Sequence, residues 1–186
     1  MSDADAELVD AFKAGDAQAL EALYWRHADR VWRYACYFSG SNDAASEIVQ
    51  DTFVRVAQHA AKFESRARFS TWLFTIVRSV AIDAAARRRR DPLQHSSEEP
   101  MQRLSAATPE PADDAAAAET RAAVRKAIAR LPENEREAVL LCEIEDLPLR
   151  EAGEILGWGE SRLKVTLFRA RRKLKDMLAP HVEVRS

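Results

Sequence analysis

The sequence predicts an all-α protein made of two small helical domains joined by a flexible linker. Only five glycines and seven prolines occur in 186 residues, and helix-favouring alanine, leucine, arginine and glutamate dominate. Apolar residues recur at spacings of three and four, the period of an amphipathic helix. Residues 91–118 lack this period and are rich in proline, serine and acidic residues, which is typical of a tether. We therefore expect domains over residues 5–90 and 119–180, with a linker over 91–118.

The first domain begins with a predicted helical hairpin. Residues 4–14 indicate one helix, Gly15 interrupts it, and Asp16 can cap the next helix. The second helix is expected to end around residues 39–41. Its apolar stripe contains Leu20, Leu23, Tyr24, His27, Val31 and Tyr34.

Two more helices complete the first domain. Asn42 or Asp43 is expected to cap a helix over residues 44–59, and residues 62–68 predict a loop because they show no period. Ser70 can then cap a long helix that ends in the arginine run 87–90. The third helix buries Ile48, Val49, Thr52, Phe53 and Val56, which leaves Glu47, Gln50, Asp51 and Arg55 on its polar side. The long helix carries Trp72, Leu73, Ile76, Val77, Val80 and Ile82, and we expect Trp72 to belong to the core.

The second domain ends in a predicted helix-turn-helix. A helix over residues 119–130 is followed by a second helix that has Pro132 in its first turn and continues to Ile144. A short helix over 149–156, a glycine-containing turn over 157–159 and a long helix over 160–178 follow. Short helix, tight turn and long basic helix are the pattern of a DNA-binding helix-turn-helix.

The last helix has one apolar and one cationic side. Its apolar stripe is Leu163, Leu167, Ala170, Leu174 and Leu178. A neighbouring face carries Arg162, Thr166, Arg169 and Lys173, flanked by Lys164, Arg171, Arg172 and Lys175. This face can supply both base-reading and phosphate-contacting groups, although a solvated basic face is the alternative interpretation. We expect Trp158 to be a packing residue and not a base contact.

Composition excludes several other classes. The net charge is −2, but the basic residues cluster at 87–90 and 162–175, apart from the acidic ones. Cys36 and Cys142 have no ligand-type spacing, and the four histidines form no metal or catalytic-triad pattern. No stretch approaches the roughly 18 apolar residues of a membrane span. We therefore predict a cytoplasmic protein without enzymatic activity, cofactor, metal, small-molecule substrate or membrane insertion.

Three segments resemble a known family. LPENEREAVLLCEIEDLPLREAGEILGWGESRLKVTLFRARRKLK, residues 131–175, resembles region 4 of bacterial extracytoplasmic-function (ECF) sigma factors, group 4 of the sigma-70 family. EIVQDTFVRV, residues 47–56, resembles region 2.2, and FSTWLFTIVRSVAIDAAARRRR, residues 69–90, resembles regions 2.3 and 2.4. The matches occur in the family's order and leave no room for a region 1.1 or region 3 domain.

The resemblance implies a dissociable subunit of bacterial RNA polymerase that recognises promoters and opens the strands. The implied partners are core RNA polymerase, through the clamp helices of its largest subunit and its flap, promoter DNA and an anti-sigma factor. The polymerase-binding residues would be Glu47, Gln50, Asp51 and Arg55. The −10 residues would be Phe63, Glu64, Arg66, Arg68, Arg78, Ser79, Asp83, Arg87 and Arg88. The −35 residues would be Glu160, Ser161, Arg162, Lys164, Val165, Thr166, Arg169, Arg172 and Lys173.

The chain also departs from the family pattern. Ser79 stands where family members often carry asparagine, so a short hydroxyl replaces an amide that can bond a base edge. The turn sequence over residues 158–163 is atypical, and Val165-Thr166 replaces a common Ser-Arg pair. Arg162 is therefore inferred from its place in the first turn of the last helix. Two rival functions are an autonomous helix-turn-helix regulator that never joins polymerase and a small enzyme.

Overall fold

The computed structural model describes residues 4–64, 68–90 and 115–183, with backbone only for residues 115–118 and 180–183. Within these ranges the chain is helical and contains no strand. The described residues form two compact units, one from residues 4–35 and 43–90 and one from residues 36–42 and 115–183. The prediction of an all-α protein with two units is confirmed. The expected linker, residues 91–118, lies outside the described residues except for its last four, which are helical.

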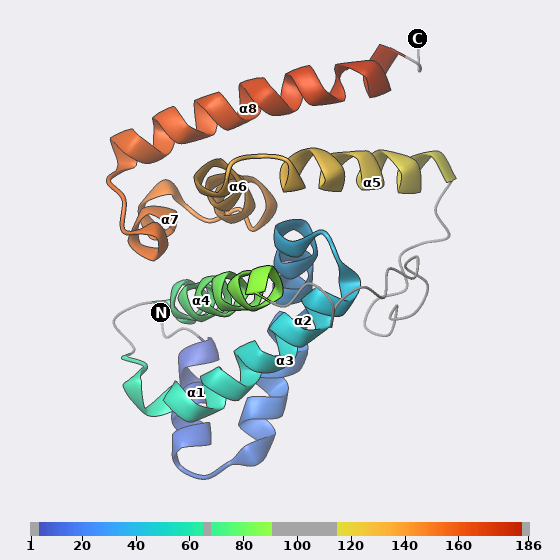
Figure 1. Ribbon diagram of the computed structural model, residues 1–186. Coiled ribbons are helices and arrows are strands. Elements are labelled where there is room, and N and C mark those ends of the chain that lie inside the picture. Colours follow the sequence, from blue (N-terminus) through green and yellow to red (C-terminus); the bar gives the residue numbers. More distant parts are fainter. Residues whose placement is uncertain (1–3, 65–67, 91–114, 184–186) are drawn as a thin grey trace. The chain divides into compact units, whose positions relative to one another are not determined.

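The described residues before position 91 contain four α-helices, which Figure 1 labels. They are α1 (Ala4–Lys13), α2 (Ala17–Ser39), α3 (Asn42–His59) and α4 (Phe69–Arg90), with a 3-10 turn, η1 (Ala60–Lys62), after α3. Aromatic contacts join them in the core of the first unit. The ring centroids of Tyr24 and Phe53 lie 4.8 Å apart, and those of Tyr34 and Phe74 lie 5.7 Å apart. The predicted apolar residues of α3 are all buried.

The helical hairpin of α1 and α2 forms as expected. Gly15 has a φ of +102°, which few other residues adopt, and the Asp16 Oδ1 atom accepts the backbone N–H of Gln18 at 2.9 Å. Two polar contacts hold α1 in place. His27 Nε2 lies 2.9 Å from Asp5 Oδ2, and Lys13 Nζ donates to the carbonyl of Phe63 at 2.9 Å.

The start of α4 differs from the expectation. The helix begins at Phe69, so Ser70 lies inside its first turn instead of capping it. Phe69 is fully buried, and its ring centroid lies 5.2 Å from that of His27 and 5.7 Å from that of Trp72. Core packing of Phe69 therefore fixes where the helix begins. The start of α3 is also one to two residues early, because Asn42 is its first residue.

By length and composition alone α4 is long and apolar enough to cross a membrane. Polar residues are interspersed among its apolar ones, so it contains no unbroken apolar run of that length. The core explains this composition. Leu73, Phe74, Val77 and Val80 of α4 have no exposed surface, as in the central helix of a globular unit.

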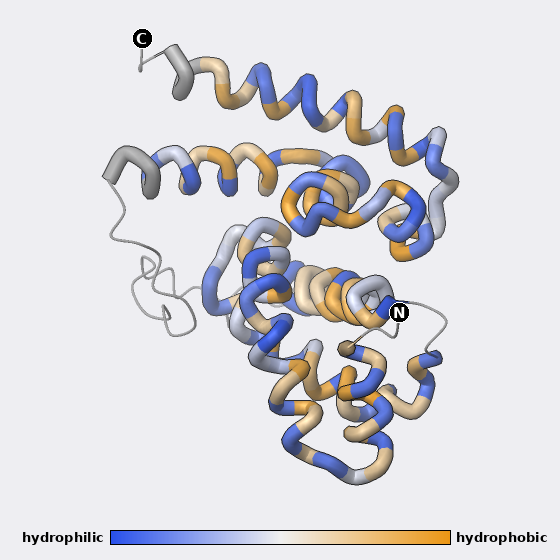
Figure 2. Tube along the Cα trace, turned by 180° about the vertical axis from the view of Figure 1, so that it is seen from behind, coloured by the Kyte–Doolittle hydropathy of each residue, from blue (hydrophilic) through white to orange (hydrophobic). Residues whose placement is uncertain are grey.

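The second unit contains α5 (Ala115–Ala129), α6 (Glu133–Val139), the π-helix η3 (Leu140–Ile144), α7 (Leu149–Leu156) and α8 (Glu160–Glu183). Its core lies where α8 packs on α5, α6 and α7. Leu163, Leu167 and Ala170 of the predicted stripe are buried there. Figure 2 shows hydrophobic and hydrophilic residues alternating along α8, as an amphipathic helix requires.

Several helix bounds in the second unit differ from the sequence analysis. The helix α5 starts at Ala115 and not Glu119, because the run of alanines favours helix. Pro132 precedes α6 as its cap residue, and the helix expected to reach Ile144 changes to π geometry after Val139. The last helix extends past Pro180 to Glu183 instead of ending at Leu178.

Two glycines shape the turn between α7 and α8. Gly157 ends α7 in the left-handed conformation, with a φ of +68°, which favours glycine. Gly153 was not predicted to matter. The backbone N–H of Trp158 donates to the carbonyl of Gly153 at 2.9 Å, and a Cβ atom on Gly153 would lie only 2.7 Å from the carbonyl oxygen of Trp158. The close return of the chain over α7 therefore requires glycine at position 153.

Candidate nucleic-acid interface

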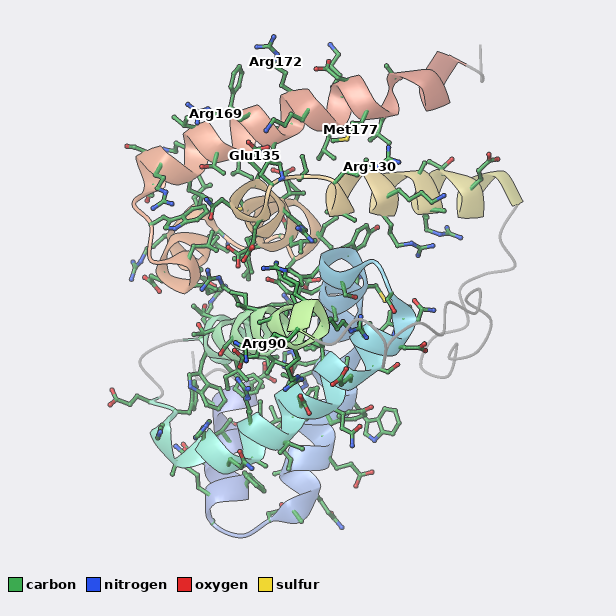
Figure 3. All side chains as sticks on the ribbon, viewed as in Figure 1. Arg90, Arg130, Glu135, Arg169, Arg172 and Met177 are labelled. Carbon is green, nitrogen blue, oxygen red and sulfur yellow. The ribbon has the colours of Figure 1, made fainter. Side chains whose placement is uncertain are left out.

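The side of α8 away from its buried stripe is exposed and cationic. Figure 3 shows Arg169 and Arg172 on the outer side of this helix and Met177 on the side that faces α5. The exposed residues of this side include Arg162, Lys164, Arg169, Arg171, Arg172, Lys173 and Lys175. The predicted −35 residues therefore share one solvent-facing surface, which we call the α8 face.

The cations of the α8 face differ in whether the chain itself neutralises them. Lys164 Nζ lies 3.4 Å from Glu160 Oε2, Lys173 Nζ lies 2.8 Å from Glu135 Oε1, and Arg171 pairs with Glu143. Among the described residues of the α8 face, the guanidinium of Arg162 contacts only the ring of Trp158, and three further cations, Arg169, Arg172 and Lys175, have no ion-pair, hydrogen-bond or ring partner. These three charges are available to an external anion.

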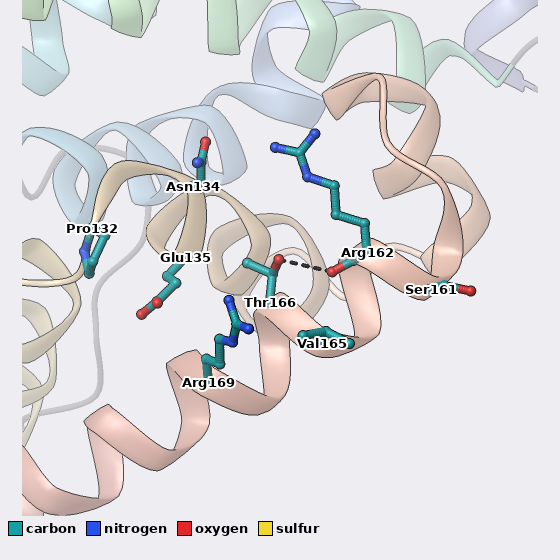
Figure 4. A pocket seen from close by; sticks show the side chains of 8 residues that line it. All are labelled: Pro132, Asn134, Glu135, Ser161, Arg162, Val165, Thr166 and Arg169. Atoms are coloured by element: carbon teal, nitrogen blue, oxygen red, sulfur yellow. Dashed lines mark hydrogen bonds between the residues drawn. The ribbon is translucent and has the colours of Figure 1, made fainter.

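A groove opens beside the first turns of α8, where the N-terminal part of α6 faces it (Figure 4). Its volume is about 520 Å³, and it is lined by Pro132, Asn134, Glu135, Ser161, Arg162, Val165, Thr166 and Arg169. Five of the predicted −35 residues are thus brought together at one site. The Thr166 hydroxyl donates to the Arg162 carbonyl at 2.9 Å, which fixes the Thr166 side chain against its own helix.

Arg162 does not extend freely into solvent. Its Cζ atom lies over the ring of Trp158, 4.2 Å from the ring centroid. Trp158 is half-buried in the turn before α8. The interpretation of Trp158 as a packing residue is consistent with this burial, but it missed the contact with Arg162, although a spacing of four residues could have suggested it.

The polar side of α3 is joined to α4 by ion pairs. Arg87 Nη2 lies 3.3 Å from Glu47 Oε1 and 3.1 Å from Asp51 Oδ2, and Arg88 Nη2 lies 3.9 Å from Glu47 Oε2. Arg55 makes a second, separate set of contacts between the same two helices, with 2.7 Å between Arg55 Nη2 and Asp83 Oδ2 and 3.2 Å between Arg55 Nη1 and Ser79 Oγ. We call these seven residues the α3–α4 network. It contains three carboxylates and three guanidinium groups, so its net charge is zero.

The α3–α4 network contains residues from two predicted sites that the sequence analysis treated as separate. Glu47, Asp51 and Arg55 were assigned to polymerase, whereas Ser79, Asp83, Arg87 and Arg88 were assigned to the −10 element. Gln50 is exposed and has no contact with the network. The partners are 24 to 41 residues apart in sequence, so no local spacing could have revealed them.

The predicted −10 segment before α4 is only partly accessible. Phe63 is 3% exposed, and its ring centroid lies 5.3 Å from that of Trp72 and 5.8 Å from that of Phe69. Its ring therefore packs in the core of the free chain, and its assignment as a base-contacting residue stays a prediction. Glu64 and Arg68 are exposed and Arg78 is half-buried, while Arg66 lies outside the described residues.

One exposed aromatic residue was missed. Phe168 of α8 is 68% exposed, although large apolar side chains are normally covered. Val165, already among the predicted −35 residues, is 51% exposed one turn earlier. The sequence contains a signal for Phe168, since it falls off the Leu163–Leu167–Ala170 stripe. Apolar groups among cations suit contact with base methyl groups or sugars.

The part of the chain that the structure describes holds no group of three His, Cys, Asp or Glu side chains arranged to bind a metal. The two thiols are also poor nucleophiles. Burial raises the pKa of Cys36 to about 12 and that of Cys142 to about 11, and a thiol reacts through its thiolate.

Two family models match the chain. Sigma-70 region 2 matches residues 23–91, and Sigma-70, region 4 matches residues 121–174. The first match covers most of α2, α3 and α4, and the second contains the helix-turn-helix and the cationic part of α8. Both matches coincide with the two surfaces described above.

Curated relatives match over nearly the whole chain. The ECF RNA polymerase sigma factor SigM of Mycobacterium tuberculosis is 30% identical over 174 residues, which are 94% of this chain and 84% of the relative. The ECF RNA polymerase sigma factor SigE of Mycolicibacterium smegmatis is 32% identical over 170 residues, or 90% of this chain. The match spans only 65% of the length of SigE.

Solved structures share the fold. CnrH, solved with the cytosolic domain of CnrY, superposes with a TM-score of 0.72 at 24% identity, covering 96% of this chain and 99% of CnrH. The sigma factor RpoE of Bartonella quintana, solved with the anti-sigma factor NepR, gives a TM-score of 0.66 at 23% identity, covering 86% of this chain and 96% of RpoE.

Proposed function

The chain belongs to the ECF family of RNA polymerase sigma factors, and we propose that it binds core RNA polymerase and directs transcription initiation at promoters with particular −10 and −35 elements. The observation that carries this proposal is the α8 face. A helix that follows a tight turn presents Arg169, Arg172 and Lys175 without internal partners, and such free cations on an exposed helix suit the phosphates of duplex DNA.

In this proposal the groove residues read the −35 element. Arg162 and Arg169 supply N–H donors that suit guanine, Val165 supplies an apolar contact for a thymine methyl group, and Thr166 lies between them. Arg172 and Lys175 continue along the helix and contact phosphates, which position the helix without selecting sequence. The first turns of α8 thus read the bases of the −35 element, and the later turns bind its phosphates.

The first unit binds polymerase and the −10 element. Glu47, Gln50, Asp51 and Arg55 of α3 dock on the clamp helices of the largest subunit, while Ser79, Asp83, Arg87 and Arg88 of α4 contact promoter DNA. The α3–α4 network supports a coupling between polymerase docking and DNA binding. Arg87 can bind a phosphate only if its ion pairs with Glu47 and Asp51 break. A basic group of polymerase that takes over Asp51 would release Arg87.

The same proposal assigns a role to each domain and an anti-sigma partner to the chain. Residues 5–90 act as region 2, residues 119–180 act as region 4, and residues 91–118 connect them, so two weak contacts on one promoter reinforce each other. CnrH and RpoE were each solved with a partner protein, which supports an anti-sigma partner for this chain. The site of action is the cytoplasm, where promoter DNA and polymerase are found.

In vitro transcription with purified core RNA polymerase on a promoter library tests the proposal. We expect promoter-specific transcripts only when the chain is added, together with co-elution of the chain and core enzyme. Absence of both would refute the function. Tight binding of the chain alone to a palindromic operator would instead support an autonomous helix-turn-helix regulator, which the family membership does not favour.

A further inference from the structure

We propose that Trp158 is a positioning residue for promoter recognition, because its ring holds the Arg162 guanidinium in the orientation that reads one base pair of the −35 element. This inference rests on the proposed function. The observation behind it is the contact between the two side chains, in which Arg162 Cζ lies 4.2 Å from the Trp158 ring centroid. A cation over an aromatic face is attracted by the ring quadrupole, and tryptophan provides the strongest such face.

The backbone makes Trp158 a fixed platform. Gly157 turns the chain through a left-handed conformation, and the Trp158 N–H donates to the Gly153 carbonyl at 2.9 Å. The Trp158 carbonyl oxygen lies so close to Gly153 that a Cβ atom there would be 2.7 Å away. The backbone position from which the indole extends is therefore set by the turn itself, before any ligand arrives.

Stacking leaves the reading groups of Arg162 available. The guanidinium is planar and carries its N–H donors in the plane, so a ring on one face does not use them. An exposed arginine without such a contact loses side-chain conformational entropy when it binds a ligand. A contact that already holds the side chain in its bound orientation reduces this entropic cost. Arg162 lies in the first turn of α8 and lines the groove, where recognition helices contact base edges.

The chemistry identifies the ligand of the pair as a guanine edge in the major groove. Two in-plane N–H donors match the O6 and N7 acceptors of guanine, and this bidentate contact is worth about a 5- to 150-fold preference over other bases. The neighbouring acidic group, Glu160, is engaged with Lys164 at 3.4 Å. It therefore does not compete with Trp158 for the guanidinium.

Base-pair-resolved promoter selection tests this inference with the full chain and core polymerase. Arg162→Ala should abolish the preference at one position of the −35 element. Trp158→Leu should weaken the preference at that same position by about two- to fivefold, Trp158→Phe should lie between Leu and wild type, and other positions should not change. Trp158→Leu added to Arg162→Ala should have no further effect on that position.

The controls separate positioning from folding and from the proposed function. Trp25→Leu removes a tryptophan that is 61% exposed on α2 and should leave the preference unchanged. If Trp158→Leu does not fold, as judged by circular dichroism, the comparison of Trp with Phe carries the test. An equal loss at all positions, or no loss at the Arg162 position, overturns the role of Trp158. Absence of any promoter preference in the wild type would refute the proposed function instead.

Discussion

The two polar surfaces of this chain, the α3–α4 network and the α8 face, contain similar residues but differ in how many of their charges are paired internally. In the first unit, the guanidinium groups of Arg55, Arg87 and Arg88 all lie within 4 Å of carboxylates of the same unit. On the α8 face of the second unit, Arg169 and Arg172 have no such partner among the described residues. Of these two surfaces, as the structure describes them, the α8 face is therefore the one with cations that no internal carboxylate neutralises.

The difference suggests different modes of binding. The α8 face can bind a polyanion at once, with an affinity that falls as salt rises. The α3–α4 network must first exchange internal partners for external ones, which makes its binding dependent on a protein surface that supplies competing charges. Promoter contacts in the first unit would therefore follow polymerase docking.

The largest expected effect concerns Asp51. Asp51→Asn should lower affinity for core polymerase by about 10- to 100-fold, the range expected for losing a hydrogen bond to a charged group. The free energy of unfolding should change by less than about 1 kcal/mol, because the lost pair with Arg87 is exposed. Fluorescence anisotropy with labelled chain measures the affinity. Glu21→Gln, an exposed carboxylate outside the network, is the control, and equal affinities for the two variants would remove Asp51 from the docking surface.

Gly153→Ala should destabilise the second unit by roughly 1–3 kcal/mol, the cost of forcing a group into a packed site, since the new Cβ would contact the Trp158 carbonyl at 2.7 Å. Hydrogen exchange should show reduced protection in α7 and α8 and unchanged protection in α3. Gly159→Ala is the matched control, because no atom lies within 4 Å of a Cβ there. Similar exchange in both variants would contradict the packing argument.

The contrast between paired and free cations can be tested within α8 itself. Arg172→Ala should reduce the magnitude of the slope of log affinity against log salt for promoter DNA by about 0.9, the value for one phosphate contact. Arg171→Ala should have a smaller effect, because Glu143 already neutralises that side chain. Filter binding of the polymerase complex from low to high salt gives both slopes. Equal slopes would show that internal pairing does not determine which cations contact DNA.

The smallest effect concerns His27, whose pKa is lowered by burial although Asp5 opposes the shift. Arg26 and Arg30 also contribute and lower this pKa. The unfolded chain then binds more protons than the folded one between the folded pKa and 6.5, so the free energy of unfolding should fall as pH drops through that window and level off below it. Urea titrations across pH 5 to 8 measure this, and His27→Gln should flatten the curve. A wild-type stability that rises on acidification would contradict the direction of the shift.

Periodicity was sufficient for the fold but not for the site. The buried residues of α3 and the stripe Leu163–Leu167–Ala170 follow directly from helical spacing, and Gly157 follows from turn chemistry. Helix ends were less predictable, as at Phe69, where core packing replaced the expected cap at Ser70. Such tertiary contacts are invisible to local rules.

The predicted site residues share the same limitation. The assignment of Phe63 to a base contact came from the family resemblance, which did not show that its ring packs in the core of the free chain. The exposed Phe168 was overlooked. The pairing of Arg87 with Asp51 spans 36 residues and could only emerge from the packing of α3 on α4. Arg162 and Trp158, by contrast, are only four residues apart, so their contact could have been predicted from the sequence.

The central claim is that the α8 face lies in the duplex at the −35 element while the first unit holds polymerase. Val165→Cys, at a position that is 51% exposed, can carry an iron chelate that cleaves nearby DNA, in a chain whose native thiols are removed by Cys36→Ala and Cys142→Ala so that the label has one site. In the complex of this variant with core polymerase and promoter DNA, we predict strand cleavage centred on the −35 element. Cleavage elsewhere, or none in a complex that still initiates transcription, would contradict the account.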